Sequence, residues 1–195
     1  IFFQKYSQMS RSQQGLAGAG EWETLRKLLP DFKDKRVLDL GCGYGWHCIY
    51  AMEHGASSVV GVDISHKMLE VAKEKTHFPQ VEYKCCAIED VEFPEESFDV
   101  ILSSLAFHYV ADYEILVKKI YRILKSGGKL VFTVEHPVFT AYGTQDWHYN
   151  EKGEILHFPV DNYYYEGKRT AVFLGEKVTK YHRTLTTYLN TLLSN

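Results

Sequence analysis

The stretch Arg36-Val-Leu-Asp-Leu-Gly-Cys-Gly-Tyr-Gly-Trp46 decides the fold, because it joins a buried strand, a glycine-rich turn and the start of a helix. Residues 37–40 form a short, largely apolar run that is typical of a strand inside a parallel sheet. Gly41, Gly43 and Gly45 follow directly. A turn of this kind brings the backbone close to a ligand at the positive end of a helix. A glycine-rich turn that binds nothing is the alternative.

Length and composition indicate one globular domain. The chain has 195 residues, of which 45% are apolar and 24% are charged, enough to bury a core of ordinary size. The net charge of −3, from 22 basic and 25 acidic residues, argues against nucleic acid or an anionic membrane as partner. The apolar runs are far shorter than the roughly 20 residues that span a bilayer. The first residues have no signal-peptide pattern, so we expect a cytoplasmic protein.

The four cysteines are Cys42, Cys48, Cys85 and Cys86. None forms a Cys-x-x-Cys pair, and two are adjacent, which is poor geometry for a metal site or an ordinary disulfide. We expect buried free thiols and no metal.

Apolar segments of two kinds alternate along the chain. Short runs predict strands at 36–40, 58–62, within 97–103, at 81–85 and at 129–135, and longer periodic segments predict helices at 21–29, 45–54, 66–75 and after Asp112. Such alternation predicts an α/β fold, a doubly wound, mostly parallel sheet with helices on both faces.

Ligands of such sheets bind beyond the carboxyl ends of the strands. This rule predicts that one rim collects residues 41–45, Asp63, 86–89, 104–109 and 135–137. The functional site is expected there.

Two segments lie outside this pattern. Residues 1–20 are expected to form an amino-terminal arm, and residues 138–183 a cap-like insertion with strands at 155–160 and 170–174. A helix at 185–193 ends the chain. We therefore treat residues 1–195 as a single domain.

Two acids near the glycine turn narrow the class of ligand. Asp63 ends the second predicted strand, 20 residues beyond Gly43, where a carboxylate can accept two hydrogen bonds from a ribose diol. Asp39 precedes the turn, where it would suit a ligand with an ammonium group better than a pyrophosphate. Trp46 occupies the third-glycine position of the dinucleotide fingerprint, which disfavours a nicotinamide-dependent oxidoreductase. A helix cap for Asp63 and a buried ion pair for Asp39 are the structural alternatives.

These residues resemble the first motif of class I S-adenosylmethionine-dependent methyltransferases. The resemblance continues through Val62-Asp63-Ile64-Ser65, Phe93-Pro-Glu-Glu-Ser-Phe-Asp-Val100 and Leu105-Ala-Phe-His-Tyr-Val110, and it covers about residues 20–137. It is greatest to the small-molecule branch often called type 11. It implies a Rossmann-like methyltransferase fold, S-adenosylmethionine as cofactor, and methyl transfer to a small-molecule acceptor. A non-catalytic module that only binds the cofactor is the alternative function.

The resemblance also implies roles for individual residues. Asp39 would lie near the cofactor's ammonium, Asp63 would hold the ribose, and the remaining cofactor-binding positions would be Gly41, Gly43, Ile64, Ala87, Ile88, Glu89, Ser104 and Leu105. The family commonly has an acid for the adenine amino group after strand three, where this chain has Ala87. Glu89, or the backbone of residues 87–88, would have to replace it.

Methyl transfer needs an oriented acceptor more than a base, although a base helps when the acceptor is a hydroxyl. His136 and His182 are the candidate catalytic residues, with a structural, hydrogen-bonded role as the alternative for each. Tyr6, Arg11 and His108 are candidate contacts to the substrate.

Members of this family end their sheet with two further strands, which nothing after residue 193 supplies. We therefore expect a sheet that lacks its last two strands, an exposed edge at residues 130–134, and a natural protein that continues beyond residue 195.

Overall fold

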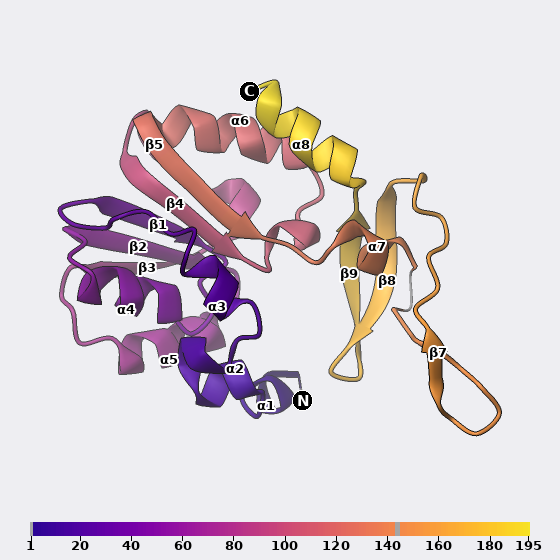
Figure 1. Ribbon diagram of the computed structural model, residues 1–195. Coiled ribbons are helices and arrows are strands. Elements are labelled where there is room, and N and C mark those ends of the chain that lie inside the picture. Colours follow the sequence, from indigo (N-terminus) through magenta and orange to yellow (C-terminus); the bar gives the residue numbers. More distant parts are fainter. Residues whose placement is uncertain (1, 143–144) are drawn as a thin grey trace.

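The computed structural model describes residues 2–142 and 145–195 and contains a five-stranded sheet with the order β3-β2-β1-β4-β5, all parallel (Figure 1). This is the predicted doubly wound architecture. The strands are β1 (Arg36–Leu40), β2 (Ser58–Asp63), β3 (Val81–Cys85), β4 (Phe98–Ser104) and β5 (Leu124–Thr133). The order places β1 at the centre, so the glycine turn that follows it opens at the middle of the carboxyl edge.

Helices cover both faces of the sheet (Figure 1). They are α4 (Trp46–Glu53) and α5 (His66–Lys75) on one face, and α6 (Tyr113–Ile123) and α8 (Leu185–Leu193) on the other. Because strand side chains alternate, Leu38 and Leu40 face α6 whereas Val37 and Asp39 face α4. The alternation within β1 thus buries a carboxyl group beneath the glycine turn.

Side-chain caps fix where several helices begin. The Ser65 hydroxyl accepts from the Met68 amide at the start of α5, and Asp112 accepts from the Ile115 amide at 3.0 Å at the start of α6. Thr184 accepts from the Thr187 amide at the start of α8. Each cap satisfies a backbone donor that lacks a partner within the helix.

The amino-terminal arm consists of short elements, α1 (Phe2–Tyr6), α2 (Ser10–Gln13) and η1 (Gly15–Gly18). The helix predicted at 21–29 is shorter than expected, since α3 (Trp22–Leu25) gives way to turns before Pro30. Trp22 and Leu25 pack with Ala19 in a small cluster of their own. This cluster ties the arm to the domain.

Strand β5 lies at the edge of the sheet. It begins earlier than predicted and ends at Thr133 instead of Glu135, and its register against β4 shifts between Phe98 and Val100. The antiparallel hairpin of β8 (Gly167–Phe173) and β9 (Glu176–His182) forms a separate two-stranded sheet. Within the described ranges, β5 therefore has a partner on one side only.

The segment after β5 contains α7 (Pro137–Ala141), β6 (His148–Tyr149), β7 (Ile155–His157) and the β8–β9 hairpin, with short helices η2 (Ile88–Asp90) and η3 (Phe107–Tyr109) elsewhere at the rim. The strand predicted at 155–160 is limited to β7, and the one predicted at 170–174 overlaps β8, which begins earlier and ends at Phe173. Strand β9 was not predicted. Helix α8 returns to the sheet, where Tyr188 packs edge-on against Tyr113 of α6.

All four cysteines are free, as predicted. The expectation that they are buried holds for Cys42 and Cys48, but Cys86 is only half-buried and Cys85 is exposed. Cys85 ends β3 at the outer edge of the sheet. Over residues 2–142 and 145–195, no helix has the length and apolar character that crossing a membrane requires.

A substitution at Gly45 tests how closely the glycine turn is packed. Its φ is +74°, and an added Cβ would lie 2.9 Å from Cζ of Tyr83, whose hydroxyl is held by Thr76. Gly127 has a similar φ of +76° but open space around it. We expect Gly127→Ala to cost about 1–2 kcal/mol from backbone strain and Gly45→Ala about 2–4 kcal/mol, because the second substitution adds a collision. Urea unfolding measures both, and equal costs would contradict the collision.

Candidate functional site

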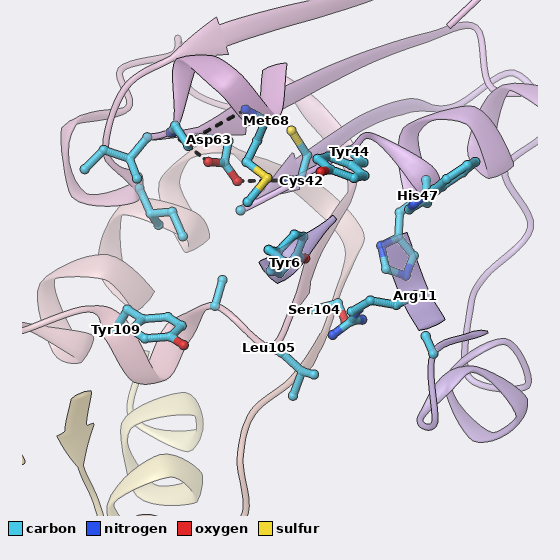
Figure 2. Close-up of a pocket in the computed structure, with 18 of the residues that line it drawn as sticks. Tyr6, Arg11, Cys42, Tyr44, His47, Asp63, Met68, Ser104, Leu105 and Tyr109 are labelled. Carbon is cyan, nitrogen blue, oxygen red and sulfur yellow. Dashed lines mark hydrogen bonds between the residues drawn. The ribbon is translucent and has the colours of Figure 1, made fainter. Parts of the chain in front are cut away.

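A cavity of about 780 Å³ opens at the carboxyl edge of the sheet. All five regions predicted to form the rim contribute to it, together with the amino-terminal arm and the β8–β9 hairpin. Figure 2 shows Asp63 and Met68 on one side of the cavity, Arg11 and His47 on another, Tyr6 between them and Tyr109 farther away. Segments distant in sequence thus converge on one space.

The glycine turn forms the floor of this space. Gly41 has a φ of +81°, and an added Cβ would lie 2.5 Å from Cβ of Ala106. At Gly43, the nearest atom to an added Cβ would be the Tyr6 hydroxyl at 3.9 Å. The turn is therefore closely packed below Gly41 and open above Gly43, where a ligand can approach the backbone.

Asp63 binds the glycine turn directly. Its Oδ2 accepts from the Gly43 amide at 2.9 Å, and its Oδ1 accepts from the Ser65 amide at 2.8 Å. Burial raises the pKa of Asp63, while these two backbone amides act to lower it. The predicted convergence of Asp63 and Gly43 is confirmed. The ribose contact remains a prediction, for which the carboxylate retains free acceptor positions.

Asp39 lies under the turn and does not line the cavity. It is fully buried; Cys48 Sγ donates to its Oδ2 at 3.5 Å, and its Oδ1 has no hydrogen-bond partner within the described residues. Burial raises the pKa of Asp39 to about 7, and the charge of Asp63 adds to the effect. A contact to an ammonium group would therefore have to pass through water or through the turn.

The residues expected around adenine meet at one mouth of the cavity. Ile64, Ala87, Ile88 and Glu89 all line it. Ile64 is 75% exposed, so its side chain offers apolar surface to a ligand without first having to leave a packed core. The structure brings these four together, and their binding roles remain predictions.

The end of β4 is linked to the arm through an acid that sequence reasoning missed. Glu21 Oε1 pairs with Arg11 at 2.5 Å and accepts from the Ser104 hydroxyl at 3.0 Å. Burial acts to raise the pKa of Glu21, but its own backbone amide, Arg11 and Ser104 outweigh burial and lower it. Leu105 follows with a φ of +54° and an amide that donates to the Thr133 carbonyl at 2.9 Å. Ser104 and Leu105 both line the cavity, as predicted.

Two aromatic side chains from different segments cover the turn. The Tyr6 ring meets Tyr44 edge-on at 5.7 Å, and burial raises the pKa of Tyr6.

His47, which sequence reasoning missed, lines the cavity one residue into α4. Burial lowers the pKa of His47 to about 4, with a smaller effect of Arg11, so this imidazole is uncharged at neutral pH.

The far end of the cavity contains His108, Tyr109, Glu135 and Phe173. His108 is 1% exposed, and its Nδ1 accepts from the Glu135 amide at 3.5 Å. Burial lowers the pKa of His108 to about 4, although Glu135 acts to raise it. His108 is thus an uncharged imidazole at neutral pH.

The structure does not bring His136 and His182 to the cavity. His136 is exposed; it caps α7, and its Nδ1 accepts from the Val138 amide at 3.2 Å. His182 is fully buried, with one ring nitrogen at 2.8 Å from the Thr140 hydroxyl and the other at 2.8 Å from the Tyr163 carbonyl. The prediction that these two histidines act in the cavity is corrected, since His136 lies outside its lining and His182 does not reach it. Both make the structural hydrogen bonds that were the alternative.

Known proteins share this architecture. The family described as "Methyltransferase domain" matches residues 38–132. A Listeria monocytogenes protein assigned to the S-adenosylmethionine-dependent methyltransferases is 58% identical, with a TM-score of 0.86 over 90% of this chain and 82% of that chain. An S-adenosylmethionine-dependent methyltransferase from Mesorhizobium loti is 41% identical, with a TM-score of 0.85 over 92% of this chain and 82% of that one. The ubiquinone biosynthesis O-methyltransferase of Coxiella burnetii is 36% identical over 112 residues, 56% of this chain and 47% of that protein.

Proposed function

Because the chain belongs to the S-adenosylmethionine-dependent methyltransferases, we propose that it transfers the cofactor's methyl group to a small-molecule acceptor. The observation that carries the proposal is the single cavity with two chemically different ends. One end has the glycine turn and Asp63, and the other has Tyr109, Glu135 and Phe173. Its volume of about 780 Å³ falls in the range of roughly 300–1,000 Å³ typical of small-molecule sites.

The residues at the first end fit an adenosyl sulfonium compound. The backbone at Gly43 is open to a ligand, and Asp63 offers a carboxylate beside it. Ile64 and Ile88 offer apolar surface for the adenine. When bound, S-adenosylmethionine supplies an electrophilic methyl group on a positively charged sulfur.

The protein's part in such a reaction is to orient the acceptor and exclude water. The arm and the β8–β9 hairpin meet over the cavity, where Lys5 Nζ donates to the Leu174 carbonyl at 2.8 Å and lies 3.7 Å from Glu176. Tyr6 lines the cavity from the arm, and Phe173 lines it from the hairpin. This contact between the arm and the hairpin supports a closed site in which a small acceptor lies beside the cofactor.

Calorimetry followed by turnover tests the proposal. We expect S-adenosylmethionine and S-adenosylhomocysteine to bind, NAD to bind far more weakly, and S-adenosylhomocysteine to be released when suitable small phenols, alcohols or amines are supplied. Cofactor binding without turnover of any acceptor in a broad panel would favour the non-catalytic module. Tighter binding of NAD than of S-adenosylmethionine would overturn the proposal.

A further inference from the structure

Glu135 lies at the centre of a partly buried polar network at the far end of the cavity. Its Oε1 lies 2.5 Å from Lys180 Nζ, and its Oε2 accepts from Gln145 Nε2 at 2.8 Å. Lys180 also donates to Gln145 Oε1 at 2.8 Å and is 2% exposed. Glu135 lines the cavity, whereas Lys180 lies behind it. The cavity is therefore lined by the carboxylate of Glu135 and not by the ammonium of Lys180.

The Glu135 carboxylate can accept further hydrogen bonds. An ionised carboxylate can accept about four hydrogen bonds, and the described partners of the Glu135 side chain are Lys180 and Gln145 at short range, with Nε2 of His108 at 4.0 Å. The Lys180 ammonium lies 5.9 Å from the centre of the Tyr109 ring and 5.8 Å from that of Phe173. Glu135 can therefore receive a further donor from the cavity while its charge stays compensated from behind.

Among the described residues that line this end of the cavity, none offers a cation to an anionic acceptor. Of the described residues that line the cavity, only Arg11 is a lysine or an arginine. Its guanidinium lies 2.5 Å from Glu21 Oε1, near Ser104. The histidines that line the cavity, His47 and His108, are uncharged at neutral pH, as described above. An acceptor carboxylate or phosphate placed beside Glu135 would lose its water without gaining a counter-charge from the described side chains that line the cavity, which is costly.

We propose that the cavity selects a ring-bearing acceptor without negative charge, and that Glu135 determines this specificity by accepting a hydrogen bond from the acceptor's hydroxyl or amino group. The inference rests on the proposed function and names its substrate class. Tyr109 and Phe173, which line the cavity together with Glu135 and lie near Lys180, supply aromatic surface for the ring. Lys180 is a positioning residue that holds the carboxylate and balances its charge.

The first test uses small probes in the presence of saturating S-adenosylhomocysteine. Catechol is an uncharged donor, benzylamine a cationic donor, benzoate an anion, and veratrole the uncharged ring without a donor. We expect NMR titrations to show catechol and benzylamine binding at least about tenfold more tightly than benzoate and veratrole, the effect of one hydrogen bond to a charged group. Equal binding of benzoate and catechol would overturn the proposal.

The second test removes the charge of Glu135 or of Lys180. Glu135→Gln leaves the Lys180 cation uncompensated, so the ratio of benzoate to benzylamine affinity should rise about tenfold, and Lys180→Met should lower it by a similar factor. The double variant, which is neutral, should return the ratio toward that of the wild type. Glu92→Gln is the matched control, because Glu92 pairs with Lys119 and Arg122 on the surface.

The outcomes separate this inference from the proposed function. Retained binding of S-adenosylhomocysteine in both variants, with opposite changes in the probe ratio, supports the specificity role. Changes of the same sign for all probes in both variants would mean that the network is merely structural and would overturn it. If Lys180→Met does not fold, Glu135→Gln and the double variant still decide. Loss of cofactor binding by the wild type would instead be a failure of the proposed function.

Discussion

Replacing Asp63 by alanine is expected to weaken the binding of S-adenosylhomocysteine by about a hundredfold. The substitution removes the acceptor of the Gly43 and Ser65 amides, at 2.9 and 2.8 Å, and with it the proposed contact to the ribose. Hydrogen bonds to a charged group contribute about 1.5–3 kcal/mol each, and about 2.7 kcal/mol corresponds to a factor of a hundred. Calorimetry on the folded variant measures the loss.

Two controls distinguish a ribose contact from a disturbed turn. Ser65→Ala keeps Asp63 and removes only the hydroxyl that caps α5, so its affinity should change little. The second control is an analogue of S-adenosylhomocysteine without the ribose hydroxyls. The wild type should bind this analogue much more weakly than it binds S-adenosylhomocysteine. The Asp63→Ala variant should bind the two compounds equally. If both proteins lose the same factor on removal of the hydroxyls, Asp63 acts only through the turn.

The sheet was predictable because its strands are short, apolar and separated by periodic helices. The bounds of β1, β3 and α5 match the prediction. The glycine turn follows Leu40, Ser65 caps α5, and the loop of residues 76–80, which contains Pro79, separates α5 from β3. Helix α3 ended early because Trp22 and Leu25 pack against the arm, a tertiary contact that periodicity cannot report. Strand β9 was missed because Lys177 and Lys180 interrupt its few apolar residues, so no apolar run marks it.

The end of the cavity at the glycine turn was predictable for the same reason, because its residues directly follow strands. The end at Glu135 was not. The prediction chose His136 over its neighbour Glu135, but β5 ends at Thr133 and the direction of a side chain beyond a strand is not set by alternation. The partner that explains Glu135 is Lys180, 45 residues away on the unpredicted strand. The same strand directs His182 into the cap, where Thr140 and Tyr163 bind it.

The second large effect concerns Asp39, whose burial without a counter-charge should make stability depend on pH. Its pKa is raised to about 7 in the folded protein, against about 3.9 in an unfolded chain. Between these values the folded state keeps a proton that the unfolded state has lost, so this group lowers the free energy of unfolding as pH rises from about 4 to about 7. The full difference corresponds to roughly 4 kcal/mol.

Asp39→Asn isolates this contribution, because the amide stays uncharged at every pH and can still accept from Cys48, which lies 3.5 Å from Oδ2. We expect the variant's free energy of unfolding in urea, minus that of the wild type, to rise from pH 4 to pH 7 and then level off. Asp31→Asn, at an exposed carboxyl group, should change the same difference little. A difference that stays flat from pH 4 to pH 8 would mean that Asp39 is ionised throughout, and hence that a cation or ordered water inside the fold stabilises its charge. The open acceptor position on Oδ1 is where such a group would bind, so either result decides whether the carboxyl group beneath the glycine turn is a neutral acid or a charge in the folded protein.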